Sequence, residues 1–95
     1  MELSLTRAIQ ALADPTRRAI LQMLQQRDMT AGEISARFAI SAPSVSHHLS
    51  VLKNADLVLA ERNGQTIVYS LNTTVVQEFL QELMQLFKVG DADHA

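Results

Sequence analysis

The stretch that decides the fold reads Ser41-Ala-Pro-Ser-Val-Ser-His-His-Leu-Ser-Val-Leu-Lys53. Within it Val45, Leu49 and Leu52 recur at spacings of four and three, the period of a helix that packs one side on a core. The leading serine can cap this helix, and a proline in the first turn does no harm because its missing N–H has no partner there. We therefore predict a capped helix with a buried apolar stripe.

The outward side of this predicted helix is small or neutral and polar: Ala42, Pro43, Ser44, Ser46, His47 and Ser50. An ordinary solvated helix carries charged residues on that side. A slim, uncharged N-terminal half that is rich in donors and acceptors suits the major groove of DNA. The alternative is a surface helix that happens to be short of charge.

Length and composition limit the protein to one small domain with an aliphatic core. The chain has 95 residues, of which 47% are hydrophobic but only 4% aromatic, so helices are expected to dominate. The absence of cysteine excludes disulfides and thiolate metal sites. No apolar run approaches the roughly 20 residues that span a bilayer, and no signal-peptide pattern is present. We expect a soluble, cytoplasmic protein.

The net charge of −2 argues weakly against a nucleic-acid partner until the charges are located. Of the ten acidic residues, four lie after position 77: Glu78, Glu82, Asp91 and Asp93. Lys88 is the only base in that part of the sequence, so residues 1–77 hold seven bases against six acids. A surface that meets DNA therefore need not be acidic, although no strong basic field is evident.

Two further helices are predicted at the N-terminus. An apolar stripe favours a short first helix: Leu3, Leu5, Ile9 and Leu12. Asp14 can cap a second helix with Pro15 at its first position, the favoured place for proline. Its inward residues are Ala19, Ile20, Met23 and Leu24. We expect Asp28 and Met29 to end it.

A capping box marks the start of a third helix at Ala31. Thr30 can accept a bond from the backbone ahead, and Glu33 can reach back to the backbone of the threonine. A connection of the length that helix-turn-helix units use then leads to the Ser41 cap. The third and fourth helices therefore form a predicted helix-turn-helix.

Three basic residues have competing roles. Near the start of a helix, Arg17 and Arg18 are expected to form surface or interhelical salt bridges, with Asp14 or Glu33 as candidate partners, rather than to bind phosphate. Lys53 can either complement the helix dipole or contact the DNA backbone. The sequence does not separate these two roles of the lysine.

After Lys53 the pattern changes to that of a β-hairpin. Residues 57–62 and 65–71 resemble strands joined by Asn63-Gly64, a strong signal for a two-residue turn. That turn sets Arg62 opposite Gln65. The tip then projects four residues outward: Arg62, Asn63, Gly64 and Gln65. The arginine suits the narrow, negative minor groove.

The last predicted helix begins at a cap within Asn72 to Thr74. It carries a wide apolar band: Val75, Val76, Phe79, Leu80, Leu83, Met84, Leu86 and Phe87. Such a band is broader than one small domain needs, so a partner subunit is its natural use. We predict a single DNA-binding and dimerisation domain over residues 1–88 and a flexible tail over residues 89–95.

The predicted fold is mainly α with a two-stranded β-hairpin, a winged helix-turn-helix. A dimer of such units would bind double-stranded DNA at two half-sites roughly 34–36 Å apart on a near-palindromic operator. The candidate DNA contacts are Ser41, Ala42, Pro43, Ser44, Ser46, His47, His48, Lys53, Arg62, Asn63, Gly64 and Gln65.

Several motifs in this order resemble the ArsR/SmtB family of bacterial repressors: Asp14-Pro-Thr-Arg-Arg18 with Ile20-Leu21, Ser46-His-His-Leu49, and Asn63-Gly-Gln65 with Tyr69. The resemblance runs from about Leu5 to Phe87. Two segments most resemble the small SdpR-type autorepressor branch: Met29-Thr-Ala-Gly32 and Tyr69-Ser-Leu-Asn-Thr-Thr74. The family implies a repressor, with its own promoter as one candidate target.

The resemblance also implies a homodimer through the first and last helices. The residues placed there are Leu3, Leu5, Ile9, Val76, Phe79, Leu80, Leu83, Met84 and Phe87. It further implies a Ser-x-His-Leu recognition signature, which puts Ser46 and His48 in the signature and His47 at its variable site. Because His48 precedes the core position Leu49, both a DNA contact and a structural role stay open.

Much of this family senses metals, and the sequence departs from that pattern. In the third helix the segment from Glu33 to Arg37 has no cysteine pair, and the last predicted helix has no histidine. Zinc prefers a tetrahedral set of nitrogen or sulfur ligands, which spaced His or Cys residues do not supply here. We predict no metal and no other cofactor, and thus a metal-independent repressor.

Other functions stay open. A protein-interaction adaptor would dock a partner on its last helix, and the resemblance implies that a membrane protein can sequester repressors of the SdpR-type branch. A metal-responsive repressor with an unrecognised site is a further alternative. No enzyme and no small-molecule substrate are expected, because neighbouring Ser and His side chains on one helix diverge and no oxyanion site accompanies them.

Overall fold

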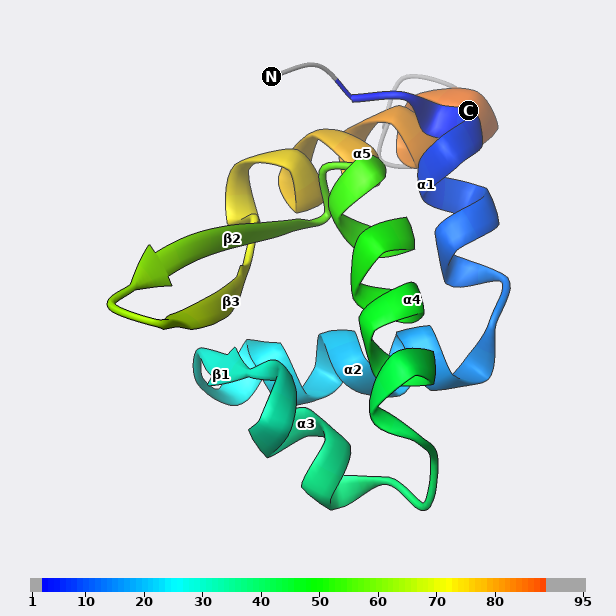
Figure 1. Cartoon of the computed structure of the whole chain (residues 1–95). Helices are drawn as coiled ribbons and strands as arrows, with labels where there is room; N and C mark the ends of the chain where they lie inside the picture. The colour runs from blue at the N-terminus through cyan, green and yellow to red at the C-terminus, as the bar shows by residue number, and fades with distance from the viewer. Residues whose placement is uncertain (1–2, 89–95) are drawn as a thin grey trace.

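The computed structural model describes residues 3–88, which fold into five helices and three strands (Figure 1). In chain order these are α1 (Leu5–Leu12), α2 (Pro15–Gln26), β1 (Met29–Thr30), α3 (Ala31–Arg37), α4 (Ala42–Asn54), β2 (Val58–Asn63), β3 (Thr66–Leu71) and α5 (Thr73–Phe87). The strands form one antiparallel sheet in the order β1-β3-β2. The fold is a winged helix-turn-helix, as predicted. The predicted tail, residues 89–95, lies outside the described residues.

Helix α4 stands at the centre of the molecule and contacts α1, α2, α3 and β2 (Figure 1). Its predicted apolar stripe, Val45, Leu49 and Leu52, is completely buried. Burying one such side chain contributes about 1.5–3 kcal/mol. The other large buried side chains come from the surrounding elements: Ile20, Leu24, Met29, Ile34, Leu57, Val58, Val75 and Phe79. The core therefore fixes the orientation of α4.

Every described helix starts with a side-chain cap. The capping oxygen accepts a bond from the backbone N–H three residues ahead, at Ser4, Asp14, Thr30, Ser41 and Asn72. The predicted capping box is confirmed, since Glu33 N–H donates to Thr30 Oγ1 at 3.1 Å and Thr30 N–H donates to Glu33 Oε1 at 2.9 Å. These caps satisfy backbone donors that have no partner inside the helix.

The C-terminal end of α4 is closed by a residue in the left-handed region. Asp56 has a φ of 61°, and its N–H donates to the Lys53 carbonyl at 2.9 Å. The next N–H, of Leu57, donates to the Leu52 carbonyl at 3.0 Å, which completes a Schellman motif. Asn72 Nδ2 donates to the Asp56 carbonyl at 3.0 Å. The end of α4 is thereby tied to the start of α5.

The sheet contains one strand more than predicted. Met29 pairs with Tyr69 and Thr30 with Val68, so β1 adds to the hairpin along β3. Met29 had been expected to close the second helix, but α2 ends at Gln26. A strand of two residues is too short to show a period in sequence, and its pairing depends on how the chain folds back.

The register of the hairpin differs by two residues from the prediction. Arg62 pairs with Ile67 instead of Gln65. Gly64 has a φ of +68°, while Asn63 and Gln65 do not have positive φ, so Gly64-Gln65 is a type II′ turn with glycine first. The expected Asn-Gly turn would need positive φ at Asn63. A shift of two keeps each side chain on its predicted face, so the tip still projects outward.

Helix α1 packs on the core through small residues. Ala8 and Ala11 are completely buried, whereas Ile9, a member of the predicted apolar stripe, is 47% exposed. The apolar stripe of α1 therefore has two sides. Leu5 and Leu12 pack against the core, and Ile9 faces away from it.

Candidate nucleic-acid interface

The N-terminal half of α4 exposes the face that the sequence predicted. None of its exposed residues is Asp, Glu, Lys or Arg: Ala42, Pro43, Ser44, Ser46 and His47. The predicted contact Ser41 is also exposed but has a structural task, since its Oγ accepts the Ser44 N–H at 3.3 Å and donates to Ser44 Oγ at 3.0 Å. Because Ser44 Oγ is the acceptor in this bond, its own hydroxyl hydrogen is available to a further acceptor. At the other end of α4, Lys53 is exposed in the last turn.

His48 is less exposed than this face and belongs to a polar cluster. Its side chain is 16% exposed, and Nδ1 lies 3.2 Å from Arg17 Nη1 and 3.9 Å from Asp14 Oδ2. Because a guanidinium can only donate, Nδ1 accepts, and the neutral ring carries its hydrogen on Nε2. Nδ1 thus holds the ring against Arg17, and Nε2 can donate a hydrogen bond to another group. The two roles that the sequence left open are compatible.

Arg17 orients this ring, a role that no local sequence pattern indicated. Besides His48, Arg17 contacts the end of α1: Nε donates to the Ala11 carbonyl at 2.7 Å and Nη2 to the Gln10 carbonyl at 3.2 Å. The last carbonyls of a helix have no partner within it, and a cation there also complements the helix dipole. Arg17 therefore links the end of α1 to the middle of α4.

Arg18 has a similar partner, because its Nη1 donates to the Leu12 carbonyl at 2.7 Å. The predicted salt bridges of Arg17 and Arg18 with Asp14 or Glu33 are thus wrong. The side chain of Glu33 instead pairs with Arg27 at 3.2 Å. The interhelical role was anticipated, but the acceptors are backbone carbonyls.

Two capping carboxylates have lowered pKa values. The backbone N–H of Arg17 stabilises the charged form of Asp14 and, with a smaller contribution from the Arg17 guanidinium, lowers its pKa below the ordinary 3.8. The backbone N–H of Thr30, followed by Arg27, lowers the pKa of Glu33 below 4.5. Both groups thus favour the folded chain when they are ionised.

The tip of the wing presents one cation. Arg62, Asn63, Gly64 and Gln65 are all exposed. Within residues 3–88 the Arg62 side chain has no hydrogen bond or ion pair. Its guanidinium is therefore available to an external anion.

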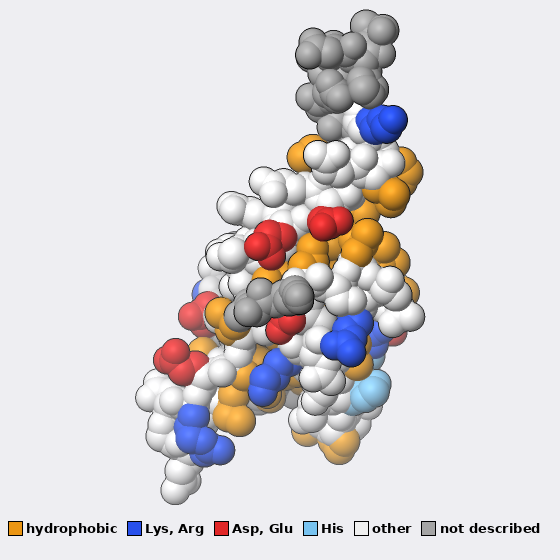
Figure 2. Space-filling model, turned by 90° about the horizontal axis from the view of Figure 1, so that it is seen from above, with side chains coloured by type: hydrophobic (Ala, Val, Ile, Leu, Met, Phe, Trp, Pro, Cys, Tyr) orange, Lys and Arg blue, Asp and Glu red, His pale blue; other side chains and the backbone are white. Residues whose placement is uncertain are grey.

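The predicted dimerisation residues lie on α1 and α5, apart from Leu3 just before α1, and these two helices contact each other at one end of the molecule (Figure 1). Figure 2 looks onto this end and shows hydrophobic side chains gathered along one side of it. On α5, Leu80 is 50%, Met84 45% and Phe87 71% exposed. The other members are partly or fully buried in the chain itself: Leu3, Leu5, Val76, Phe79 and Leu83. On α5, exposed apolar side chains therefore lie next to apolar side chains that belong to the core.

Residues 3–88 contain no group of three or more His, Cys, Asp or Glu side chains placed to hold a metal ion. In the same part of the chain no helix is both long and apolar enough to cross a membrane.

A buried-stripe helix that exposes a small polar face, next to a β-wing with a free cation at its tip, defines a winged helix-turn-helix DNA-binding protein. Residues 14–59 match the model of a family described as bacterial regulatory protein, arsR family. The chain is 51% identical over 83 residues to the transcriptional repressor SdpR of Bacillus subtilis (strain 168), which covers 87% of this chain and 92% of that protein. This protein belongs to the ArsR family.

Other relatives and solved structures agree with this assignment. The chain is 33% identical over 79 residues to the transcriptional activator HlyU of Vibrio cholerae serotype O1, covering 83% of this chain and 73% of that protein. An ArsR-like transcriptional regulator from Rhodococcus sp. RHA1 matches with a TM-score of 0.82 and 26% identity over 93% of this chain and 83% of that one. Since one relative is named a repressor and another an activator, membership in the family alone does not fix the direction of regulation.

Proposed function

We propose that this protein represses transcription by binding a near-palindromic operator as a homodimer. The observation that carries the proposal is α4, whose buried stripe holds a small, uncharged, exposed face in a fixed orientation. The 51% identity to a protein named as a repressor, over 92% of its length, supports repression rather than activation. Its own promoter is the first operator to test, and the cytoplasm is the compartment that holds this DNA in a bacterium.

In the proposed complex, α4 enters the major groove and the wing lies over the neighbouring minor groove. Ser44, Ser46 and His47 reach base edges, and the small side chains Ala42 and Pro43 allow close approach. His48 donates from Nε2 to a phosphate, and backbone N–H groups at the Ser41 end bind phosphate as well. The wing inserts Arg62 beside Asn63, Gly64 and Gln65. Lys53 contacts the backbone.

The proposed dimer covers the apolar surface of α5 together with Ile9 of α1. Large side chains that are about half exposed or more, such as Leu80 and Met84, are rare on a surface that stays in water as a contiguous patch. Two copies related by a two-fold axis would bury this surface and place two α4 helices roughly 34–36 Å apart, one turn of DNA.

Repression is proposed to be independent of metals and of other cofactors. The full sequence contains no cysteine, and α3 offers no pair of thiolates or imidazoles. Zinc sites in proteins are built mainly from such ligands. A metal-responsive repressor with ligands that neither the sequence nor residues 3–88 reveal is the alternative.

The test is fluorescence anisotropy with the native promoter and a scrambled duplex, across a salt series, with and without a chelator. The proposal expects binding that survives the chelator, falls steeply with salt and prefers the promoter by at least about a thousandfold. A Ser46→Ala, His47→Ala double variant should lose the preference while keeping its helical circular dichroism. Equal, weak binding to both duplexes would contradict DNA-sequence recognition.

The exposed apolar residues of α5 also favour a second candidate, an adaptor that docks a different protein there, such as a sequestering membrane protein. The two candidates separate at Arg62. Arg62→Ala should weaken DNA binding under the first candidate and leave partner capture through α5 unchanged under the second.

A further inference from the structure

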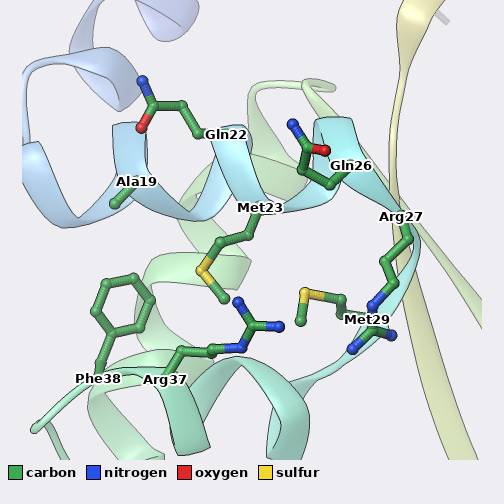
Figure 3. Close-up of a pocket in the computed structure, with 8 residues that line it drawn as sticks. All are labelled: Ala19, Gln22, Met23, Gln26, Arg27, Met29, Arg37 and Phe38. Atoms are coloured by element: carbon green, nitrogen blue, oxygen red, sulfur yellow. The ribbon is translucent and has the colours of Figure 1, made fainter.

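A hollow of about 280 Å³ opens between α2 and α3, away from the residues used above (Figure 3). Its wall is formed by Ala19, Gln22, Met23, Gln26, Arg27, Met29, Arg37 and Phe38. The volume is close to that of the smaller ligand sites in proteins. No part of the proposed DNA complex or dimer uses it.

The floor of the hollow is apolar and adaptable. Met29 is buried, and Met23 and Phe38 are half-buried. The two thioether side chains enter the hollow from α2 and from β1 (Figure 3). Methionine is unbranched and polarisable, so it can rearrange around hydrocarbon groups of different shape. The floor therefore suits an aliphatic or aromatic group.

The rim of the hollow is positive. The Arg37 guanidinium lies between the Met23 and Met29 side chains (Figure 3) and makes no hydrogen bond or ion pair within residues 3–88. Arg27, in contrast, is occupied by Glu33 at 3.2 Å. No carboxylate belongs to the wall. The hollow thus combines one unpaired cation with an apolar floor.

We propose that this hollow binds a small aliphatic or aromatic monocarboxylate. The carboxylate pairs with the fork of Arg37, and the hydrocarbon lies over Met23, Met29 and Phe38. A cation would meet two arginines, and a phosphate would leave the apolar floor unused. A neutral hydrocarbon would cover the guanidinium without giving it an acceptor.

An occupant would contact α3 at its C-terminal end. Phe38 caps α3 and is followed by the short connection to Ser41, where α4 begins. The ligand would therefore touch the helix that supports the recognition helix. This link to regulation rests on the proposed function, whereas binding in the hollow does not.

Methionine methyl NMR tests the proposal directly. The sequence contains four methionines, and two of them line the hollow while Met84 lies on α5. With ¹³C-methyl-methionine protein, octanoate or benzoate should shift the Met23 and Met29 signals saturably and leave Met84 unchanged. Uncharged 1-octanol should bind at least about tenfold more weakly, since it lacks the charge-assisted bond. Equal binding of octanoate and octanol, or equal shifts at Met84, would overturn the proposal.

A pair of charge-matched variants completes the test. Arg37→Gln should weaken octanoate binding at least about tenfold, whereas Arg62→Gln, which removes the same charge at the wing tip, should bind octanoate as the unmodified protein does. Unchanged affinity in Arg37→Gln overturns the site. The two proposals can fail separately. Octanoate binding by NMR tests the hollow through Arg37→Gln, whereas DNA binding by anisotropy tests the proposed function through Arg62→Gln.

Discussion

Helices α4 and α5 both carry an apolar stripe, but the chain covers the two stripes to different extents. Helix α4 buries all of its stripe: Val45, Leu49 and Leu52. Helix α5 buries Val75 and Phe79 but leaves four of its later large residues exposed: Leu80, Met84, Leu86 and Phe87. The packing of α4 is complete within one chain, and that of α5 is not.

This difference indicates what kind of partner each helix needs. The surface that α4 leaves outside is polar and small, so its partner must offer hydrogen-bonding groups in a narrow space, as a DNA groove does. The surface that α5 leaves outside is large and apolar, which fits another protein surface. The face of α4 is thus already oriented in the single chain, whereas in the proposed dimer α5 would complete its packing only when two copies associate.

The largest expected effect comes from breaking the packing of α4. Leu49→Ala should lower the free energy of unfolding by about 2–5 kcal/mol, because it opens a cavity at a fully buried position. Urea denaturation at one fixed protein concentration measures this loss. Ser50→Ala, an exposed neighbour, should stay within about 0.5 kcal/mol. Similar losses in both variants would contradict a stripe that is complete within the chain.

The corresponding change on α5 should act on association instead of folding. Leu80→Glu should weaken self-association by about 2 kcal/mol or more, since it places a charge where the proposed dimer would bury an apolar side chain. Sedimentation equilibrium measures the dimer constant. Gln81→Glu adds the same charge at the next exposed residue of α5 and is the matched control. If Leu80→Glu dimerises as well as the control does, α5 is not the interface.

A smaller effect is expected at the wing, which in the proposed complex contacts DNA and which belongs to neither apolar stripe. Arg62→Ala should weaken operator binding by about 1–3 kcal/mol and lower the salt slope by about one unit. Anisotropy across a salt series measures both quantities. Gln65→Ala changes the same tip without changing its charge and should leave the slope unaltered. If the salt slope of operator binding is the same for Arg62→Ala and the unmodified protein, the arginine contacts no phosphate.

Local signals accounted for most of what the sequence predicted correctly. The Asp14 and Ser41 caps, the capping box and the stripe of α4 each depend on residues a few positions apart, and all are found in the structure. The fold class followed from their order. The DNA contacts and the dimer surface remain predictions, since both involve a second molecule.

The errors concern features that depend on distant parts of the chain or on fine backbone geometry. The β1 strand exists because Met29 meets Tyr69, far along the sequence. The acceptors of Arg17 are carbonyls that only the angle between α1 and α2 brings within reach. The register of the hairpin depended on whether Asn63 or Gly64 opens the turn, and the segment Asn63-Gly64-Gln65 allows both choices. None of these was visible as a periodic pattern.

The smallest expected effect is a loss of stability in acid, which should affect the helices that support α4 but not the cap of α5. The helices that support α4 start on carboxylates, Asp14 for α2 and Glu33 within the box of α3, whereas α5 starts on the neutral Asn72. Because both carboxyl pKa values are lowered in the folded chain, their stabilisation is present above the ordinary values of 3.8 and 4.5 and is lost as the pH falls through the lowered values.

Glu33→Gln should therefore flatten the acid limb of stability. Glutamine can still accept the Thr30 N–H in the capping box, but it does not titrate. Urea midpoints at about pH 7 and about pH 3 should differ less for this variant than for the unmodified protein. Adding Asp14→Asn should flatten the limb further, because asparagine also caps helices well. If all three proteins lose stability equally, the acid response arises elsewhere, and the supports of α4 are no more sensitive to pH than the neutral cap of α5.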